Sequence, residues 1–220
     1  MKVAIVIPAY NESSTISQVV NQVKQIGIVI VVDDASSDAT SELAEKAGAV
    51  VVRHNSNRGY DGALQSGFEK ADQLGVDSVI TFDADGQHDP AVLDKIVADL
   101  KVPGMCLVLG IRPAPARLAE AVFNFWTRLR FGVNDILCGL KGYRMDLYRQ
   151  HGCFDHVGSI GTELALSGLR GDCGFTTIYV PISDRDDGQA RFGSSFRANI
   201  RIFRAFLLAI WEDVKFFISR

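Results

Sequence analysis

Residues 78–85 read Ser-Val-Ile-Thr-Phe-Asp-Ala-Asp, an apolar run that ends in two carboxylates. A short apolar run of this kind is typical of a strand that is buried on both faces, as in a parallel sheet. Strand side chains alternate between the two faces, so we expect Asp83 and Asp85 to project to one side and Ala84 to the other. The stretch therefore predicts a buried strand that delivers paired acids to the edge of a sheet.

Other apolar runs of the same kind precede and follow this one. They span residues 2–7, 28–32, 49–53 and 106–110. Between them, apolar residues recur at three- and four-residue steps around 16–26, 64–74 and 93–100, the spacing of amphipathic helices. This alternation predicts an α/β domain with a mostly parallel central sheet flanked by helices. In such a sheet, ligands bind beyond the carboxyl ends of the strands.

The pattern is less regular from about residue 112 onward. Its expected elements are a long helix at 118–129, a glycine-rich stretch at 132–142, a helix at 162–170, a strand at 174–181, a loop at 183–195 and a long amphipathic helix at 196–218. The apolar stripe of the last helix has two interpretations. It packs on the domain or on a second subunit, as in a homodimer, or it lies in a membrane interface.

The composition narrows the class of protein. The net charge of −3 supplies no global basic field, so we expect no nucleic-acid partner. The four cysteines form no Cys-x-x-Cys pair, no histidine stands at zinc spacing, and we expect reduced thiols in a cytoplasmic protein. A strand pattern begins within two residues of Met1, which leaves no room for a signal peptide, and no apolar run approaches the roughly 20 residues of a membrane span. At most, we expect peripheral contact at the inner face of the membrane through residues 196–218.

The paired acids predict a metal site. Asp83 and Asp85 would repel each other at neutral pH, and a hard divalent cation resolves this repulsion. Gln87 could add an amide oxygen, with phosphate completing the shell. The alternative is that both acids are solvated turn residues, as we expect for Asp89, which would cap a helix that begins at Pro90. The buried strand that precedes the acids favours the metal site.

Two other polar motifs follow predicted strands. Asp33-Asp34-Ala35-Ser36-Ser37-Asp38 could accept from a base or ribose, although its serines and last aspartate could equally cap a helix. Ile7-Pro8-Ala9-Tyr10-Asn11-Glu12 offers Tyr10 for stacking on a base. The chain lacks the G-x-G-x-x-G, G-x-x-x-x-G-K-[ST] and G-x-S-x-G patterns, which disfavours dinucleotide-binding, P-loop and serine-hydrolase proteins.

Together these motifs resemble family 2 glycosyltransferases. The matching segments, in family order, are residues 7–12, residues 32–38, Asn57-x-Gly59 with Gly62-Ala63-Leu64, and Asp83-x-Asp85-x-Gln87-His88. They look most like the branch that makes dolichol- or polyprenol-phosphate mannose and glucose. The resemblance is strong over 1–112 and weaker beyond.

The resemblance implies a GT-A fold and an inverting transfer from a GDP- or UDP-hexose to an acceptor such as a polyprenyl phosphate. It implies a GT-A domain at 1–195, with a nucleotide-sugar-binding half at 1–112 and an acceptor half at 113–195, followed by a C-terminal amphipathic helix at 196–220. The substrate-binding residues it implies are Pro8, Tyr10, Glu12, Asp34, Asn57, Gly59, Asp83, Lys141 and Arg191. The ligands it implies for Mg²⁺ or Mn²⁺ are Asp83, Asp85 and Gln87.

Further residues are candidates for the chemistry itself. Besides Asp85, Arg112 and Arg185 fit family positions and would stabilise the charge that develops on the leaving diphosphate, unless they are ordinary surface charges. A lipid phosphate acceptor is already anionic and needs no base, whereas a hydroxyl acceptor does. Glu163 is the candidate base, and its alternative role is to interact with a helix dipole.

The chain also departs from that branch. Cys138 stands where the branch usually has serine, and Ala190-Arg191 where it has Ser-Lys. These departures leave open a hydroxyl acceptor in cell-surface glycan synthesis, or a protein that binds nucleotide sugars with impaired catalysis. A nucleotidyltransferase would also use paired acids and a metal, but it would want a glycine-rich loop, and residues 8–14 contain no glycine.

Overall fold

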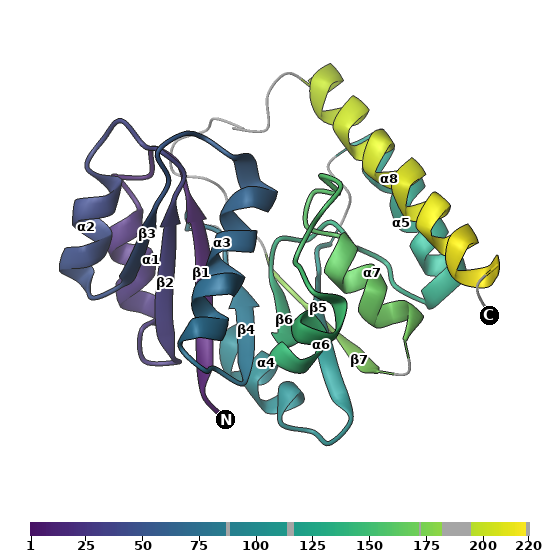
Figure 1. The fold of residues 1–220 in the computed structure, drawn as a ribbon, viewed down its shortest axis with the longest axis horizontal. Coiled ribbons are helices and arrows are strands. Elements are labelled where there is room, and N and C mark those ends of the chain that lie inside the picture. The colour runs from purple at the N-terminus through teal and green to yellow at the C-terminus, as the bar shows by residue number, and fades with distance from the viewer. Residues whose placement is uncertain (87–88, 114–116, 172, 182–194, 219–220) are drawn as a thin grey trace.

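The computed structural model describes residues 1–86, 89–113, 117–171, 173–181 and 195–218, which fold around one seven-stranded sheet (Figure 1). The strands are β1 (Val3–Ala9), β2 (Ile28–Asp33), β3 (Val50–Arg53), β4 (Ser78–Thr81), β5 (Met105–Ile111), β6 (Lys141–Arg144) and β7 (Gly174–Tyr179). The helices are α1 (Ile16–Val23), α2 (Thr40–Ala47), α3 (Gly59–Gln73), α4 (Val92–Leu100), α5 (Leu118–Phe131), α6 (Met145–His151), α7 (Glu163–Arg170) and α8 (Ser195–Ile218).

The sheet is mostly parallel, as the sequence predicted. Its strand order is β3-β2-β1-β4-β6-β5-β7, and only β6 runs antiparallel to its neighbours β4 and β5. The sequence did not predict β6, because this short strand begins and ends with basic residues and follows a glycine-rich stretch. Its reversed direction places its first residue, Lys141, beside the last residue of β4, Thr81. Residues from the second half of the chain thereby reach the edge where the parallel strands end.

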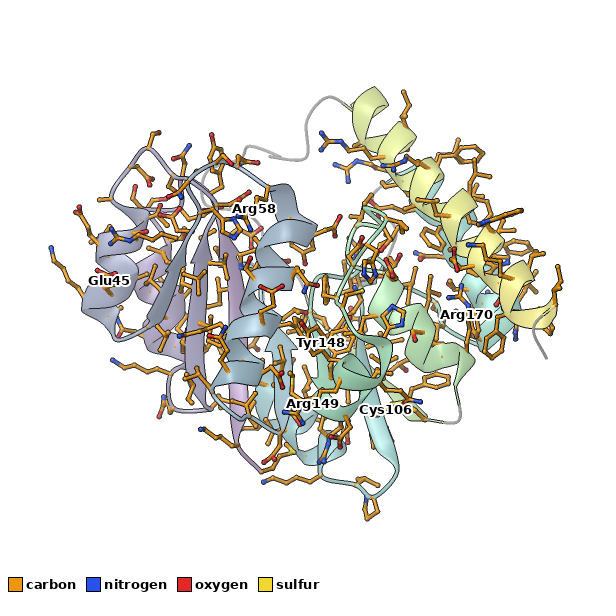
Figure 2. All side chains as sticks on the ribbon, in the orientation of Figure 1. Glu45, Arg58, Cys106, Tyr148, Arg149 and Arg170 are labelled. Atoms are coloured by element: carbon orange, nitrogen blue, oxygen red, sulfur yellow. A yellow bond between two sulfur atoms is a disulfide. The ribbon has the colours of Figure 1, made fainter. Side chains whose placement is uncertain are left out.

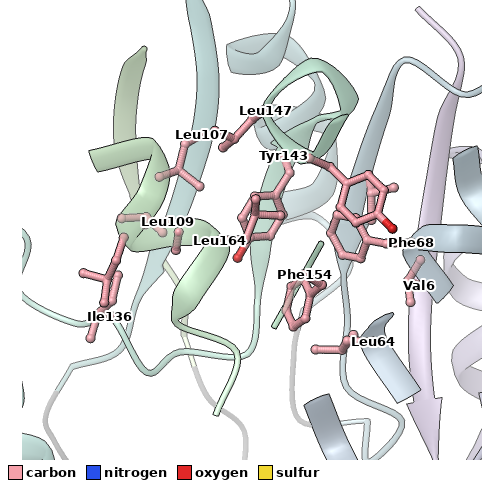
Figure 3. Packing of buried hydrophobic residues seen from close by; sticks show 14 of the residues in the cluster. Val6, Leu64, Phe68, Leu107, Leu109, Ile136, Tyr143, Leu147, Phe154 and Leu164 are labelled. Atoms are coloured by element: carbon pink, nitrogen blue, oxygen red, sulfur yellow. The ribbon is translucent and has the colours of Figure 1, made fainter. Parts of the chain in front are cut away.

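Helices cover both faces of the sheet. Residues of α1, α2 and α4 pack with Ile5 on one face, and residues of α3, α6 and α7 pack with Val6 on the other. The alternation of Ile5 and Val6 is the expected two-residue period of a strand buried on both sides. Figure 3 shows the second face, where the rings of Phe68, Tyr143 and Phe154 lie close together. The two covered faces leave the strand ends as the place for a binding site.

The expected helices form, but several of their boundaries differ: those expected around 16–26 and 64–74 span Ile16–Val23 and Gly59–Gln73. The helix expected at 118–129 continues to Phe131 and ends at Gly132, whose φ of +76° favours glycine. The helix expected at Pro90 begins at Val92 instead, because Asp89 accepts a hydrogen bond from the N–H of Ala91 in the turn before it. Helix α6 was not predicted. The loop expected at 183–194 lies outside the described residues, and Ser195 already belongs to α8.

The cysteines do not all remain free thiols. Cys106 and Cys173 form a disulfide with their Cα atoms 5.8 Å apart, so the prediction of four reduced thiols is wrong for this pair. The two residues are 67 positions apart, and the pairing of β5 with β7 is what brings them together. Cys138 and Cys153 are free and buried. Reduced cysteines therefore no longer support a cytoplasmic location.

The C-terminal helix α8 packs on the domain through one face only. Its buried residues include Ala198, Ile202 and Ala205, and it lies along α5 (Figure 1). Asp213 of α8 is paired with Arg130 and with Arg170, the latter labelled beneath α8 in Figure 2. Among the helices of the described residues, not one combines the length and hydrophobicity needed to cross a bilayer.

Candidate active site

The paired acids lie directly beyond the carboxyl end of β4. Ala84 is buried, whereas Asp83 and Asp85 are both partly exposed; because β4 ends at Thr81, these residues belong to the turn after the strand, and the strand alternation expected for them does not apply. The chain turns at Gly86, whose φ is +73°. Two adjacent, partly exposed carboxylates are a suitable oxygen-donor set for a hard divalent cation. The third expected ligand, Gln87, lies outside the described residues.

Asp83 is surrounded by residues from three other segments. A Cβ at Gly139 would lie within 2.4 Å of the Asp83 carboxylate, so the backbone at Gly139 packs directly against this side chain and a larger residue would displace it. Burial lowers the pKa of Lys141, although nearby negative charges, including Asp83, oppose that change. The Lys141 ammonium donates to the carbonyl of Gly161 at 3.0 Å. Burial and then the charge of Asp83 raise the pKa of Tyr60 well above its ordinary value. Lys141 and Tyr60 are therefore both within electrostatic range of Asp83, and a role for either in binding an anionic ligand stays a prediction.

The loop after β1 is tied to the loop after β2. The N–H of Asn11, a residue with a φ of +55°, donates to Ser36 at 2.9 Å, and the N–H of Glu12 donates to Thr40 at 2.8 Å. Glu12 is buried, whereas Tyr10 is 47% exposed beyond the strand end. Pro8 lies within β1. Tyr10 is thus placed where a stacking residue needs to be, and its contact with a base stays a prediction.

Asp34 holds the loop between β3 and α3. Its carboxylate accepts from the N–H groups of Arg58 and Gly59 at 2.7 and 2.8 Å, and it lies 2.7 Å from Nδ1 of His54. The N–H of Gly59 also donates to Asn57 at 3.1 Å. Figure 2 labels Arg58 at the strand ends. The N–H of Gly59 therefore brings Asp34 and Asn57 together, and His54, which the sequence did not single out, links Asp34 to Ser66 of α3.

Arg112 follows β5 and is engaged with protein carboxylates. Its Nε lies 2.7 Å and its Nη2 2.9 Å from the two oxygens of Asp135, and Nη2 lies 3.1 Å from Glu120. Burial opposes the charge, but Asp135 and Glu120 hold the pKa of Arg112 above its ordinary value. The guanidinium thus fixes the segment that leads to Gly139, and its direct contact with a phosphate stays a prediction. The other expected cations, Arg185 and Arg191, lie outside the described residues.

Glu163 is the first residue of α7 and is held by two histidines. Its Oε1 lies 3.1 Å from Nε2 of His151, and its Oε2 accepts from the N–H of His156 at 2.7 Å. Burial opposes ionisation, yet these donors lower the pKa of Glu163 to about 2. A carboxylate with so low a pKa is a weak general base, because it holds a proton poorly near neutral pH. The contacts favour the interpretation of Glu163 as a helix-terminal group.

The structure also gathers residues that we expected to stand apart. His151, Cys153 and Glu163 offer ligand atoms that all lie within 4.8 Å of one another. From the sequence we expected no histidine or cysteine at zinc spacing, and the fold nevertheless brings these potential ligands together. The signal lies in His151-x-Cys153-x-x-His156, followed by Glu163, a pattern that becomes a cluster only because α6 and α7 meet.

The carboxylate of Asp61 makes the stability of the fold depend on pH. Burial and then Asp155 raise the pKa of Asp61 from 3.8 to about 6, although the N–H groups of Gly161 and Ile160 donate to it. The native state therefore binds this proton more tightly than the unfolded chain. Stability increases as the pH falls from about 6 to about 4, and ionised Asp61 costs stability above that window.

We expect Asp61→Asn to remove this dependence. The free energy of unfolding of the wild type, relative to the variant, should be up to about 3 kcal/mol higher near pH 4 than near pH 7, at about 1.4 kcal/mol for each pKa unit. Chemical denaturation at a series of pH values measures the difference. The variant also loses one backbone hydrogen bond, which lowers its free energy of unfolding by the same amount at every pH. A difference in stability between wild type and variant that does not change with pH would therefore contradict the raised pKa of Asp61.

Comparison with known proteins gives these residues a context. Residues 4–155 match the family model described as glycosyl transferase family 2, a match that includes β1, β4, both paired acids and Lys141. An uncharacterized protein of Methanocaldococcus jannaschii is 36% identical over 64% of each chain, so the matched part spans less than two thirds of that relative. The undecaprenyl-phosphate mannosyltransferase of Micrococcus luteus is 27% identical over 98% of both chains.

A solved structure establishes the fold. Glucosyl-3-phosphoglycerate synthase from Mycobacterium tuberculosis, crystallised with Mg²⁺ and uridine diphosphate, superposes with a TM-score of 0.74. The superposition covers 94% of this chain and 79% of that chain at 17% sequence identity. The GT-A fold expected from the sequence is confirmed.

Proposed function

Because the chain belongs to glycosyl transferase family 2, we propose that it transfers a hexose, with inversion, from a nucleoside diphosphate sugar to a polyprenyl phosphate. The observation that carries the proposal is the pair of partly exposed acids beyond β4, with Lys141 and Tyr60 within electrostatic range of Asp83. We propose this acceptor class because the Micrococcus luteus relative, which matches along nearly its whole length, is named an undecaprenyl-phosphate mannosyltransferase.

The donor half supplies the nucleotide site in this proposal. Tyr10 lies beyond β1 for stacking on the base, and the Asp34 network holds the loop at 54–59 against the same edge of the sheet. Asp83 and Asp85 would hold Mg²⁺ or Mn²⁺, with Gln87 as the further expected ligand. When bound, the cation would neutralise charge on the leaving diphosphate. The UDP in the solved neighbour favours testing uridine nucleotides first, alongside guanosine nucleotides.

The acceptor half would position an anionic nucleophile. A lipid phosphate already carries its charge, so positioning contributes most of the rate and no general base is needed. This fits the low pKa of Glu163, which suits a structural carboxylate better than a proton acceptor. Lys141 is buried, and Asp83 is among the charges that act on it, so we propose it as a cation near the diphosphate on the acceptor side. Arg185 and Arg191 complete the basic residues that we propose for the phosphates.

Transfer to the lipid tests this proposal. The full chain should convert UDP- or GDP-hexose and a short polyprenyl phosphate, in the presence of Mn²⁺, into a polyprenyl phosphohexose of inverted anomeric configuration, detected by mass spectrometry and NMR. If the hexose is transferred only to hydroxyl acceptors, the acceptor is a hydroxyl compound and not a lipid phosphate. Binding of the donor without any transfer would instead identify a nucleotide-sugar-binding protein with impaired catalysis.

The apolar face that α5 and α8 expose is consistent with an acceptor that resides in a membrane. Large apolar side chains that are at least 41% exposed follow one stripe on each helix. They are Leu118, Val122, Phe125 and Leu129 on α5, and Ile200, Phe203, Leu207, Trp211, Val214 and Phe217 on α8. Exposed Arg201 and Arg204 lie on α8 beside this stripe. We propose that this apolar face rests on an anionic membrane surface, with the cytoplasmic leaflet as the expected location.

Two substitutions test membrane contact. Phe203→Ser with Trp211→Ser should weaken binding to phosphatidylglycerol vesicles at least 10-fold, because burying each large apolar side chain contributes about 1.5–3 kcal/mol. Sedimentation with vesicles measures the binding. Phe175→Ser on β7 is the matched control, since it removes an aromatic ring that is 37% exposed on another element. If the wild type does not bind vesicles but forms a dimer that the double variant loses, the face is a homodimer interface.

A further inference from the structure

We propose that His151, Cys153, His156 and Glu163 form a binding site for a zinc ion, separate from the paired acids. His151 ends α6 and Glu163 begins α7, so the site would join the two helices across the connecting segment. The set combines imidazole, thiolate and carboxylate donors, the ligand types that zinc prefers in proteins. Asp83 and Asp85 offer only oxygen and suit a harder cation. The two sites thus differ in the metal that they select.

Oε1 of Glu163 lies close to a donor atom of each of the other three residues, and the donor atoms of His151, Cys153 and Glu163 all lie within 4.8 Å of one another. Oε1 of Glu163 lies 3.1 Å from Nε2 of His151, 3.4 Å from Nδ1 of His156 and 3.8 Å from Sγ of Cys153. Zinc–ligand bonds of about 2.0–2.3 Å place neighbouring ligand atoms about 3.5 Å apart. One contact is tighter, because Sγ of Cys153 lies 2.6 Å from Nδ1 of His156. The side chain of His156 is 68% exposed and can rotate to widen it.

The surroundings orient the ligands and leave a route for the ion. Oε2 of Glu163 is held by the N–H of His156 at 2.7 Å, which leaves Oε1 directed at the other donors. Such a hydrogen bond to the distal atom of a ligand is a common support of zinc sites. Cys153 is 4% exposed, whereas His151, His156 and Glu163 line a cavity of about 960 Å³ that also reaches Arg170 and Lys215. Solvent in this cavity can therefore bring the ion to the exposed ligands, next to the buried thiol of Cys153.

The site would fix a segment that contacts the proposed active site. Between the two helices, Gly161 accepts from the ammonium of Lys141 at 3.0 Å and donates to Asp61 at 2.6 Å. Ile160 has a φ of +58°, a conformation that non-glycine residues rarely adopt. An ion that joins His151 to Glu163 would restrain this segment at both ends. The zinc site is therefore a structural clamp beside Lys141, and the reaction proposed above does not depend on it.

Cobalt substitution tests the site directly. The full chain, stripped of metal with a chelator, should bind one equivalent of Co²⁺ with the intense near-ultraviolet thiolate-to-cobalt band and the visible spectrum of a tetrahedral site, and Zn²⁺ should displace it. Cys153→Ser should abolish the thiolate band. Cys138→Ser, which removes the other free cysteine, should retain it, and so should Asp85→Ala, which separates this result from the proposed transferase site.

Folding of the variants is checked by circular dichroism without metal. Should Cys153→Ser fail to fold, His156→Ala replaces it, because this exposed ligand can be removed safely and should weaken Co²⁺ binding at least 10-fold. A wild type without a thiolate band, a band that survives Cys153→Ser, or binding that saturates only at millimolar Co²⁺ would each overturn the proposal.

Discussion

Asp85→Ala is expected to abolish the metal-dependent binding of nucleoside diphosphate while the fold stays intact. Asp85 is partly exposed in the turn beyond β4, next to buried Ala84, so its removal leaves the core unchanged. Its loss would leave Asp83 as the one carboxylate of the pair. Hexose transfer should fall by on the order of 100-fold or more, because the charge on the leaving diphosphate would lack its counter-ion.

Calorimetry with UDP or GDP in the presence of Mn²⁺ measures this effect. Asp89→Ala is the matched control, since Asp89 is an exposed aspartate only four positions further along the same segment. It accepts from the N–H of Ala91 at 2.9 Å, so its loss should affect the start of α4 slightly and leave nucleotide binding unchanged. Unchanged affinity in Asp85→Ala would end the metal assignment for the paired acids.

The second large effect is on stability. Asp135→Ala should lower the free energy of unfolding by about 3–5 kcal/mol, because it leaves Arg112 buried with half of its carboxylate partners. Asp135 is 3% exposed and accepts both from the Arg112 side chain and from the N–H of Leu137 at 3.2 Å, so the segment before Gly139 should also loosen.

An exposed ion pair provides the control for Asp135. Asp72 and Arg149 are 2.8 Å apart, with side chains that are 43% and 45% exposed, so Asp72→Ala should cost at most about 1 kcal/mol. Urea denaturation of both variants gives the comparison. Equal losses in Asp135→Ala and Asp72→Ala would show that the Arg112 pair contributes no more than a surface contact.

The sequence predicted the N-terminal half well, because its strands are long apolar runs and its helices repeat at the expected spacing. The position of the paired acids at 83 and 85 beyond a buried strand could be predicted for the same reason, but the directions of their side chains could not, because β4 ends at Thr81 and the acids belong to the following turn. The disulfide between Cys106 and Cys173 could not be found, because it depends on which strands become neighbours.

The second half of the chain was harder to predict, for a physical reason. Strand β6 carries lysine and arginine at its ends, and a lysine that is buried beside an acid looks like a surface residue in the sequence. The contact between α6 and α7 that gathers His151, Cys153 and Glu163 is likewise tertiary. Arg112 fitted a family position, but its partners Asp135 and Glu120 were visible only once the chain was folded.

The antiparallel direction of β6 also has consequences for folding during translation and for truncated forms of the chain. Residues 78–81 pair with residues 141–144, so during translation β4 cannot gain this neighbour until residue 144 has left the ribosome. A fragment ending at residue 112 would carry the loops that we propose for nucleotide binding, but it would present one side of β4 as an open row of backbone donors and acceptors. Such a row recruits other strands, and an excised donor half would be prone to aggregate.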